Sequence, residues 1–411
     1  MSQRKSSKSS KSKSSNLLRS IGAIIGAILV LIAGLLTQGG GNTPSATNNS
    51  VTNTRRPTVV NNSSTQVASV SGSVREISVG QGFGYRRDFW QVYFTAPTGS
   101  SRSRDYNGGI NENLATAIGE VRSTLDIAAF EFNSPFITQA VLDAEARGVR
   151  VRMVTDTQSG LNDEDTTISQ LIAAGIPVVD DVRTALMHDK FMIMDSQVVW
   201  TGSWNYTIND TYRNNNSAIV LRSQQAVQLY QAEFDEMFTS RSFGPRSPAN
   251  NVGTFTQDGV VISIYFAPEN DVDTVVAQTV ATAQRSIRFL AFSFTLDNVA
   301  AAMQERFGEG VIIQGIFETS GSEQPASELR PLLCAGMDMR QDGNPYFLHH
   351  KVIIIDNNTV LVGSFNFSAS ATDSNDENLI IIQDADIAAL YIQEFERRWA
   401  EAVLPANIQC G

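Results

Sequence analysis

Cysteine is scarce in this 411-residue chain, which contains only Cys334 and Cys410. Two cysteines are too few for a disulfide framework, and they lack the clustered spacing of a zinc site. A single bridge between them stays open, but Cys410 lies next to the end of the sequence and is expected to be incidental. With 42% apolar and 18% charged residues, the chain can bury one large core or two ordinary ones, and two domains are the first expectation.

Lysine and histidine are almost absent after the first residues. Four of the six lysines precede residue 14, so Lys190 and Lys351 are the only lysines in the rest of the chain. The three histidines, His188, His349 and His350, lie within two residues of these lysines. Because the same rare residue types occur together twice with the same spacing, the pattern indicates chemistry rather than a solvated sheet end.

Basic residues are outnumbered by acidic residues over most of the chain. Residues 1–75 hold nine of the 31 Lys and Arg residues and none of the 42 acids, so residues 76–411 have a net charge of −20. A nonspecific nucleic-acid surface normally needs a basic stripe. A polyanionic substrate would therefore have to be held by a local cluster of positive charge, against an unfavourable overall field.

The first 80 residues differ in composition from the rest. Residues 1–16 form a basic tail, and residues 17–37 are mostly apolar, near the lower length limit for a membrane span. Positive charge before an apolar helix favours a cytoplasmic N-terminus, so we expect a single-pass membrane anchor with the following chain on the extracytoplasmic side. A cleaved signal peptide, which would give a secreted protein, is the alternative. Residues 38–80, rich in Ser, Thr and Asn, are expected to be a flexible linker.

The remaining sequence is duplicated. MHDKFMIMDSQVVWTGSWNYT, residues 187–207, aligns without a gap on LHHKVIIIDNNTVLVGSFNFS, residues 348–368, at an offset of 161. Upstream, LDIAAFEF aligns on IRFLAFSF, and VRVRMVTD aligns on VIIQGIFE, both at an offset of 162. We therefore expect two repeats, covering residues 81–248 and 249–411.

Each repeat alternates apolar runs that are typical of buried strands with segments of helical spacing. Strands that alternate with helices favour an α/β sheet covered by helices. The runs FMIMD and VIIID are expected to be buried strands that end at a turn. The sequence therefore predicts an α/β fold built from two similar units.

Strand geometry separates the three histidines. Side chains at positions i and i+2 of a strand share a face, so His188 is expected beside Lys190 and His349 beside Lys351. His350 faces the opposite side of its strand. The repeat alignment agrees, since His349 aligns with His188 whereas His350 aligns with an acid. We therefore predict that His350 is replaceable and that His350→Ala keeps most activity, whereas His349→Ala loses it.

The two aligned segments resemble the two HxKx4Dx6GSxN signatures of the phospholipase D superfamily. The matching residues are His188, Lys190, Asp195, Gly202, Ser203 and Asn205 in the first repeat, and His349, Lys351, Asp356, Gly363, Ser364 and Asn366 in the second. The resemblance covers most of residues 85–405. It implies two α/β sandwich units related by a pseudo-twofold axis, with both motifs in one site. A monomer would then suffice, with no metal and no cofactor.

The resemblance also implies the chemistry. One imidazole attacks a phosphodiester phosphorus to give a phosphohistidine, and the other protonates the leaving alkoxide and then activates water. Family precedent makes His188 the nucleophile and His349 the acid. Lys190 and Lys351 would supply positive charge to the nonbridging oxygens. The neutral donors to the phosphate would be Ser203, Asn205, Ser364 and Asn366.

Asp195 and Asp356 have two interpretations. The motif places them among the catalytic residues. Their position at the end of a buried strand instead suits a turn or a structural ion pair, which is the interpretation that the residues favour.

The groups that orient the histidines are also open. Glu377 lies 28 residues after His349 and is expected to fix the tautomer of that ring, and the same offset from His188 reaches Asn216. Because an amide cannot stabilise an imidazolium as a carboxylate does, three alternatives follow. Asn216 suffices, or another acid such as Asp210 replaces it, or the roles of nucleophile and acid are exchanged.

The substrate is the least determined feature. The expected membrane tether, the acidic body and the aromatic residues near the motifs favour a phospholipid. The segment SSRSRDYNGG, with Arg86 and Arg87, could instead grip a nucleic-acid backbone, as in nucleases of the superfamily. A phosphatidyl transferase of the cardiolipin synthase type is a third alternative, since a phosphohistidine accepts an alcohol or water. We expect a lipid phosphodiesterase that hydrolyses or transfers head groups.

Overall fold

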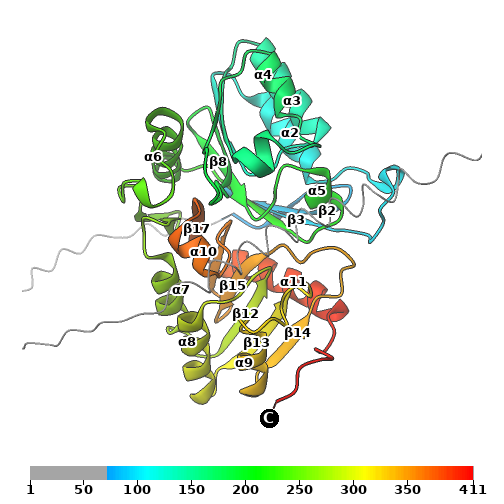
Figure 1. Cartoon of the computed structure of the whole chain (residues 1–411), viewed down its shortest axis with the longest axis vertical. Coiled ribbons are helices and arrows are strands. Elements are labelled where there is room, and N and C mark those ends of the chain that lie inside the picture. Colours follow the sequence, from blue (N-terminus) through cyan, green and yellow to red (C-terminus); the bar gives the residue numbers. More distant parts are fainter. Residues whose placement is uncertain (1–71, 411) are drawn as a thin grey trace, which may run out of the picture. The chain divides into compact units, whose positions relative to one another are not determined.

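The computed structural model describes residues 72–410, which form two β-sheets covered by helices (Figure 1). The first sheet contains β1 (Arg75–Ile77), β2 (Gly82–Arg87), β3 (Trp90–Thr95), β4 (Thr124–Ala129), β5 (Arg150–Thr155), β6 (Val178–Asp180), β7 (Lys190–Met194), β8 (Val198–Gly202) and β9 (Ser217–Leu221). The second contains β10 (Gly253–Gln257), β11 (Val260–Ala267), β12 (Ser286–Ala291), β13 (Ile312–Phe317), β14 (Asp338–Gln341), β15 (Lys351–Ile355), β16 (Thr359–Gly363) and β17 (Glu377–Gln383). Apart from β1, each sheet is built from residues of one of the two predicted repeats. The expectation of a flexible linker was wrong for residues 75–77, because they form β1 and pair with β2.

The two sheets have equivalent strand orders. The first runs β1-β2-β3-β9-β8-β7-β4-β5-β6 and the second runs β10-β11-β17-β16-β15-β12-β13-β14, so β1 is the extra edge strand. In the first sheet β4 pairs with β5 and β5 with β6 in parallel, and in the second β12 pairs with β13 and β13 with β14 in parallel. The strands β7 and β15, which begin at the two lysines, are interior strands and pair antiparallel with β4 and β12. The predicted α/β architecture with two similar units is confirmed.

Helices cover both faces of each sheet. They are α2 (Ile110–Glu120), α3 (Pro135–Ala146), α4 (Ile168–Ala173), α5 (Ile208–Tyr212) and α6 (Gln224–Ser240) in the first repeat, and α7 (Val272–Val280), α8 (Asp297–Gly308), α9 (Leu329–Cys334), α10 (Ala369–Asp373) and α11 (Ala385–Glu401) in the second. Figure 1 shows α2, α3 and α4 together outside one sheet, and α7, α8 and α9 outside the other.

The two repeats share one buried core. Tyr230 and Phe234 of α6 and Tyr391 and Phe395 of α11 belong to a single hydrophobic cluster that also includes residues of both sheets. Each sheet has one further cluster on its outer side, under the outer helices. The shared core, called the inner core below, holds the two repeats together by burying apolar surface of both.

The alternation of side chains along β7 and β15 follows the predicted parity. All residues of both strands are buried, so each strand packs on two sides. Val352 and Ile354 contact the inner core, whereas Ile353 and Ile355 contact the outer cluster of the second repeat. His350 has the parity of the inner core and therefore faces away from its neighbour in the sequence, as predicted.

Cys334, the last residue of α9, forms a disulfide with Cys410, and their Cα atoms are 5.3 Å apart. The expectation that Cys410 is incidental was wrong. The sequence could not show the pairing, because it depends on how the segment after α11 returns to α9. The bridge joins residues separated by 76 positions and thereby restrains the unfolded chain.

The expectation of a membrane anchor rests on residues that the structure does not describe. Within residues 72–410 no helix is long and apolar enough to cross a bilayer. The basic tail, the expected anchor at residues 17–37 and most of the expected linker lie outside the described residues.

Candidate active site

The backbone of each motif histidine is held by the other repeat. The N–H of His188 donates to the carbonyl oxygen of Asp376 at 3.0 Å, and the N–H of His349 donates to the carbonyl oxygen of Asn215 at 2.9 Å. Asp376 directly precedes β17, and Asn215 lies just before β9. The two repeats are therefore hydrogen-bonded to each other at the residues that precede β7 and β15. Neither repeat fixes its own histidine unaided.

The ring of each histidine is oriented across the same boundary. His188 Nδ1 lies 2.7 Å from Glu377 Oε2, and His349 Nδ1 lies 2.9 Å from Asn216 Oδ1. An oxygen acceptor at Nδ1 places the ring proton there and leaves Nε2 as the basic nitrogen. The prediction that Glu377 orients His349 was wrong, because the two repeats exchange their orienting residues.

Asp210 lies beside Asn216 at the second histidine. Its Oδ2 is 3.6 Å from His349 Nδ1, beyond hydrogen-bond distance, and accepts from the backbone N–H of Asn205 at 2.9 Å. Asp210 therefore adds negative charge near His349 but does not replace Asn216 as the direct partner.

The two lysines lie beside the histidines, as predicted. Lys190 Nζ donates to the carbonyl oxygen of His188, and Lys351 Nζ donates to that of His349 at 2.9 Å. Burial lowers the pKa of Lys190 to about 8 and lowers the pKa of Lys351 well below its usual value. Burial, followed by the charges of both lysines, also lowers the pKa of each histidine well below its usual value. Burial and the neighbouring lysines therefore favour the neutral form of both histidines in the substrate-free protein.

Two phenylalanines that the motif does not include, Phe130 and Phe292, each contact the histidine and the lysine of one motif. The ring centroid of Phe130 lies 4.7 Å from that of His188 and 4.7 Å from Lys190 Nζ. Phe292 makes the same contacts with the second histidine and lysine, at 4.8 and 4.7 Å. A cation–π contact holds an ammonium group without neutralising it. The signal that could have identified this pair is their alignment in LDIAAFEF and IRFLAFSF.

The two motif serines support the orienting residues. Ser203 Oγ donates to Asn216 Oδ1 at 2.8 Å. Ser364 Oγ accepts from the backbone N–H of Asn378 at 2.9 Å and is among the groups that lower the pKa of Glu377. In the substrate-free structure both hydroxyl groups therefore support the orienting residues, and their expected role as direct phosphate donors stays a prediction.

The two motif asparagines differ from the serines. The Oδ1 atoms of Asn205 and Asn366 are buried, and neither has a hydrogen-bond partner within residues 72–410. Asn205 Nδ2 lies 3.4 Å from Glu131 Oε2. Burial, and then the charge of Asp210, raise the pKa of Glu131 to about 8. Glu131 was missed in the sequence, although it aligns with Ser293 in the second repeat and makes the two halves unequal.

The motif aspartates lie away from the histidines, at the far ends of β7 and β15. Asp195 accepts the backbone N–H groups of residues 122–124 at 2.7 to 3.1 Å. Asp356 accepts those of residues 284–286 at 2.7 to 2.9 Å. This position contradicts the interpretation that Asp195 and Asp356 are catalytic. They fasten the turn after each strand to the start of the neighbouring strand, as the structural interpretation predicted.

Replacing Asp356 by Asn is expected to destabilise the fold without changing kcat per folded molecule. Burial opposes ionisation of Asp356, but the three backbone N–H groups outweigh it and hold its pKa below the usual value. A lowered pKa gives stability that is full above the unfolded-state pKa of about 3.9 and is lost as the pH falls through the folded-state value. In urea unfolding, the free energy of unfolding of D356N should therefore be lower than that of the parent at pH 7, and the two values should converge near pH 2. An equal loss of kcat and stability would contradict the structural role.

His350 is fully buried against α11. Its Nε2 lies 3.2 Å from Glu394 Oε1, and Glu394 also binds Arg397 at 2.8 Å and Arg398 at 3.3 Å. These contacts face the inner core, away from the lysines. The structure thus gives His350 a role in the core.

His350→Ala is expected to keep kcat within about threefold while lowering the free energy of unfolding by about 1–3 kcal/mol. The loss comes from one buried hydrogen bond, because Arg397 and Arg398 still neutralise Glu394. Measurements of kcat and of urea unfolding check both parts. A large fall in kcat at unchanged stability would place His350 in the chemistry.

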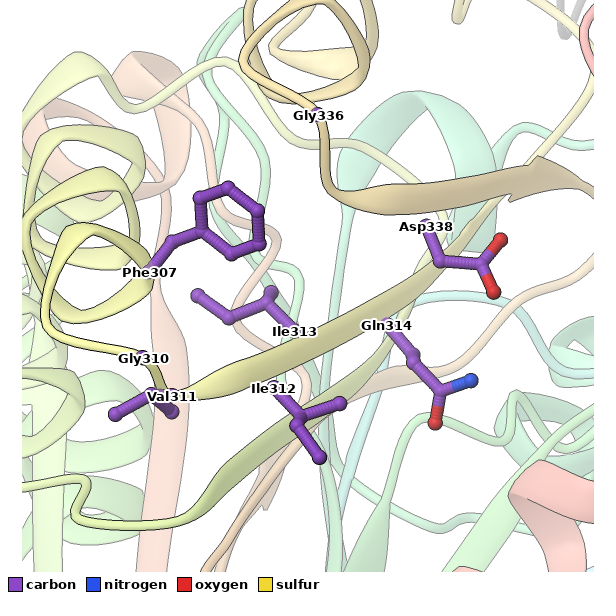
Figure 2. Close-up of a pocket in the computed structure, with 8 residues that line it drawn as sticks. All are labelled: Phe307, Gly310, Val311, Ile312, Ile313, Gln314, Gly336 and Asp338. Atoms are coloured by element: carbon purple, nitrogen blue, oxygen red, sulfur yellow. The ribbon is translucent and has the colours of Figure 1, made fainter.

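One surface hollow of the second repeat is unrelated to the histidines. It has a volume of about 410 Å³ and lies between the end of α8 and the start of β13, where Phe307 and Ile312 line it (Figure 2). Ile312 pairs with Ser286 at the start of β12, whereas Lys351 pairs with Ala291 at its end. The hollow is therefore at the opposite edge of the sheet from the motif.

Comparison with known proteins identifies the family. The family model described as "Cardiolipin synthase, PLD-like domain" matches residues 114–238 and 276–399, once in each repeat and over more than half of the chain. The chain belongs to the phospholipase D superfamily. The resemblance of the two motifs is thereby confirmed.

Individual relatives of this phospholipase D superfamily member match over parts of the chain. The mitochondrial cardiolipin hydrolase of Xenopus tropicalis is 36% identical over 119 residues, which are 29% of this chain and 57% of that protein. The phospholipase D of Rickettsia bellii is 34% identical over 139 residues, 34% of this chain and 69% of that protein. The chain thus spans little more than half the length of the first relative.

A solved structure resembles both repeats together. The phosphatidylserine synthase of Haemophilus influenzae is 13% identical, with a TM-score of 0.55, over 73% of this chain and 86% of that chain. At this identity the similarity shows the fold alone.

Proposed function

We propose that the chain is a phospholipase D-type phosphodiesterase that acts through a phosphohistidine. The observation that carries the proposal is the crossed pair of contacts, His188 with Glu377 and His349 with Asn216. These contacts occupy both Nδ1 atoms and direct the chemistry to the two Nε2 atoms, beside two buried lysines.

In the first step, His188 Nε2 attacks phosphorus as the bond from phosphorus to the leaving oxygen breaks. His349 Nε2 gives its proton to the departing alkoxide. The phosphorylated ring of His188 carries positive charge, which the Glu377 carboxylate stabilises. Asn216 suits the acid, because a neutral amide stabilises the protonated ring less than a carboxylate does and so lets Nε2 release its proton. The bound phosphodiester anion raises the pKa of His349 and so allows it to enter the step protonated.

In the second step, His349 Nε2 takes a proton from water as the water oxygen attacks phosphorus. The nitrogen–phosphorus bond then breaks, which returns neutral His188, and the phosphomonoester leaves. An alcohol in place of water gives transfer instead of hydrolysis. Lys190 and Lys351 stabilise the negative charge on the nonbridging oxygens, so the reaction at phosphorus calls for no metal ion.

We propose a phospholipid as the substrate. The net charge of −20 over residues 76–411 disfavours a nucleic-acid polyanion. The curated relatives named above are a cardiolipin hydrolase and a phospholipase D. Both observations support a lipid phosphodiester over DNA or RNA.

The test offers the purified full-length chain vesicles of phosphatidylcholine, phosphatidylglycerol and cardiolipin, and separately single-stranded DNA and RNA, with and without EDTA. Release of head group or of phosphatidic acid from a lipid is expected, with no cleavage of nucleic acid. Nuclease activity without lipid turnover would overturn the lipid proposal. Loss of activity in EDTA while circular dichroism shows an intact fold would overturn the metal-independent reaction.

We further propose that residues 17–37 anchor the protein, with the two repeats outside the cytoplasm. The bridge between Cys334 and Cys410 supports this placement, because disulfides persist mainly in oxidising compartments. N-terminal sequencing of the mature chain tests it. A mature chain that begins after residue 37 would favour secretion after signal cleavage.

A further inference from the structure

A group of buried carboxylates lies on the inner-core side of the first repeat. Glu233 and Glu236 lie three residues apart on α6, and Glu269 follows β11 in the second repeat. The three carboxylates, called the acidic cluster below, have oxygen atoms within 4.8 Å of one another. Glu233 is 1% exposed and Glu236 is 7% exposed, whereas Glu269 is only partly buried.

No base compensates this charge in the described part of the chain. Within residues 72–410, none of the three carboxylates forms an ion pair with Lys, Arg or His. The largest influences on the pKa of Glu233 are burial and then other carboxylates, beginning with Glu269, and all of them raise it. Adjacent buried anions are costly unless they bind protons or a positive ion.

A fully buried amide points into the acidic cluster. Asn251 Nδ2 lies 2.5 Å from Glu233 Oε2 and 3.0 Å from Glu269 Oε1. Within residues 72–410, Asn251 Oδ1 has no partner at hydrogen-bond distance and angle. The oxygens of Glu236 also lack a partner in good geometry, although the Ser247 hydroxyl lies close enough to lower the pKa of Glu236. Buried polar atoms without partners are rare in native proteins. Carboxylate and amide oxygens are the ligands that hard cations prefer.

The second repeat shows how the equivalent charge is balanced. YQAEFDEMF, residues 230–238, aligns with YIQEFERRW, residues 391–399, and places Glu233 opposite Glu394. Glu394 is surrounded by His350, Arg397 and Arg398.

In the first repeat these bases are replaced. Glu236 aligns with Arg397, and Asp189 aligns with His350. Asp189 is fully buried, and its Oδ2 has no partner within residues 72–410. The same buried glutamate position is thus surrounded by positive charge in one repeat and by negative charge in the other.

We propose that the acidic cluster binds one calcium ion, which supplies the positive charge that arginines supply in the second repeat. Calcium takes six to eight oxygen ligands, and three carboxylates with the Asn251 amide turned to present its oxygen form an oxygen-only set. The cluster offers no thiolate or imidazole that would favour zinc. Partial exposure of Glu269 gives the ion access from solvent.

The ion joins the two repeats, because α6 and Glu269 belong to different ones. It lies on the inner-core side of β7, whereas His188 and Lys190 have the opposite strand parity. The proposal therefore concerns the fold and does not depend on the reaction at phosphorus.

The test compares the EDTA-treated full-length chain with and without 1 mM CaCl₂ or MgCl₂. Isothermal titration is expected to show one calcium per chain, and calcium is expected to raise the apparent Tm by about 5 °C if the concentration is about 100-fold above Kd. Absence of a calcium response, together with elemental analysis that finds no divalent ion in the untreated protein, would overturn the proposal. A response to magnesium alone would overturn the choice of ion.

Variants separate the acidic cluster from general charge effects. Glu233→Gln is expected to abolish the calcium response, whereas Glu396→Gln, which removes an exposed carboxylate from α11, should retain it. Glu236→Arg copies the second repeat and should raise Tm in EDTA while removing the response to calcium. A full response in Glu233→Gln, or a loss in Glu396→Gln, would contradict the assigned site. Because Glu233→Gln keeps the size of the side chain, a failure of the arginine variant to fold leaves the test intact.

Discussion

His349→Ala is expected to lower steady-state turnover of a phosphodiester by about 10⁴-fold or more, yet still to form the phosphoenzyme. The variant keeps His188 and its Glu377 contact but lacks the group that activates water. With a p-nitrophenyl phosphodiester, whose leaving group needs no acid, H349A should release about one nitrophenolate per chain in a burst and then stall. His188→Ala should give no burst, because it lacks the attacking nitrogen.

The third histidine is the matched control for this experiment. His350→Ala should show both the burst and continued turnover, since its side chain contacts Glu394 in the inner core. Mass spectrometry at alkaline pH, where phosphohistidine survives, would locate the phosphoryl group. A burst in H188A that is absent in H349A would exchange the two roles.

Glu377→Gln is expected to lower kcat by about 10²- to 10⁴-fold with little change in fold, because an amide stabilises a charged histidine poorly. The crossed geometry assigns the effect to His188. The burst rate with the p-nitrophenyl ester should therefore fall. If Glu377 acted on His349 instead, the burst with this activated ester would be unaffected and only turnover would slow.

Asn216→Asp is the complementary change at the other histidine. A carboxylate 2.9 Å from His349 Nδ1 would favour the protonated ring and raise its pKa. The alkaline limb of the kcat profile should move to higher pH, while the burst rate stays within about threefold of the parent. A changed burst rate with an unmoved alkaline limb would show that Asn216 acts on the nucleophile.

The duplicated fold and the chemical centre could be predicted from sequence because both rest on local patterns. Strand parity put His188 with Lys190, and the repeat alignment distinguished His349 from His350. These inferences use neighbours along one strand or a constant offset, and the contacts of Lys190, Lys351 and His350 agree with the placement that they predict.

The orienting contacts could not be predicted because they join the two repeats. A constant offset pairs Glu377 with His349 in the sequence, whereas the crossing of the repeats brings it to His188. The disulfide between Cys334 and Cys410 could not be predicted for a related reason, since packing sets the path of the last segment. Glu131 was visible only as a difference between two otherwise similar strands.

The crossed contacts also bear on how the two halves of the chain can change. In an assembly of two identical repeats, any substitution would appear at both histidines at once. Because both repeats occupy one polypeptide, Glu377 and Asn216 can differ, and each histidine can acquire its own proton affinity. Covalent linkage thus allows two similar repeats to acquire unequal histidines, as the proposed reaction requires of a nucleophile and an acid.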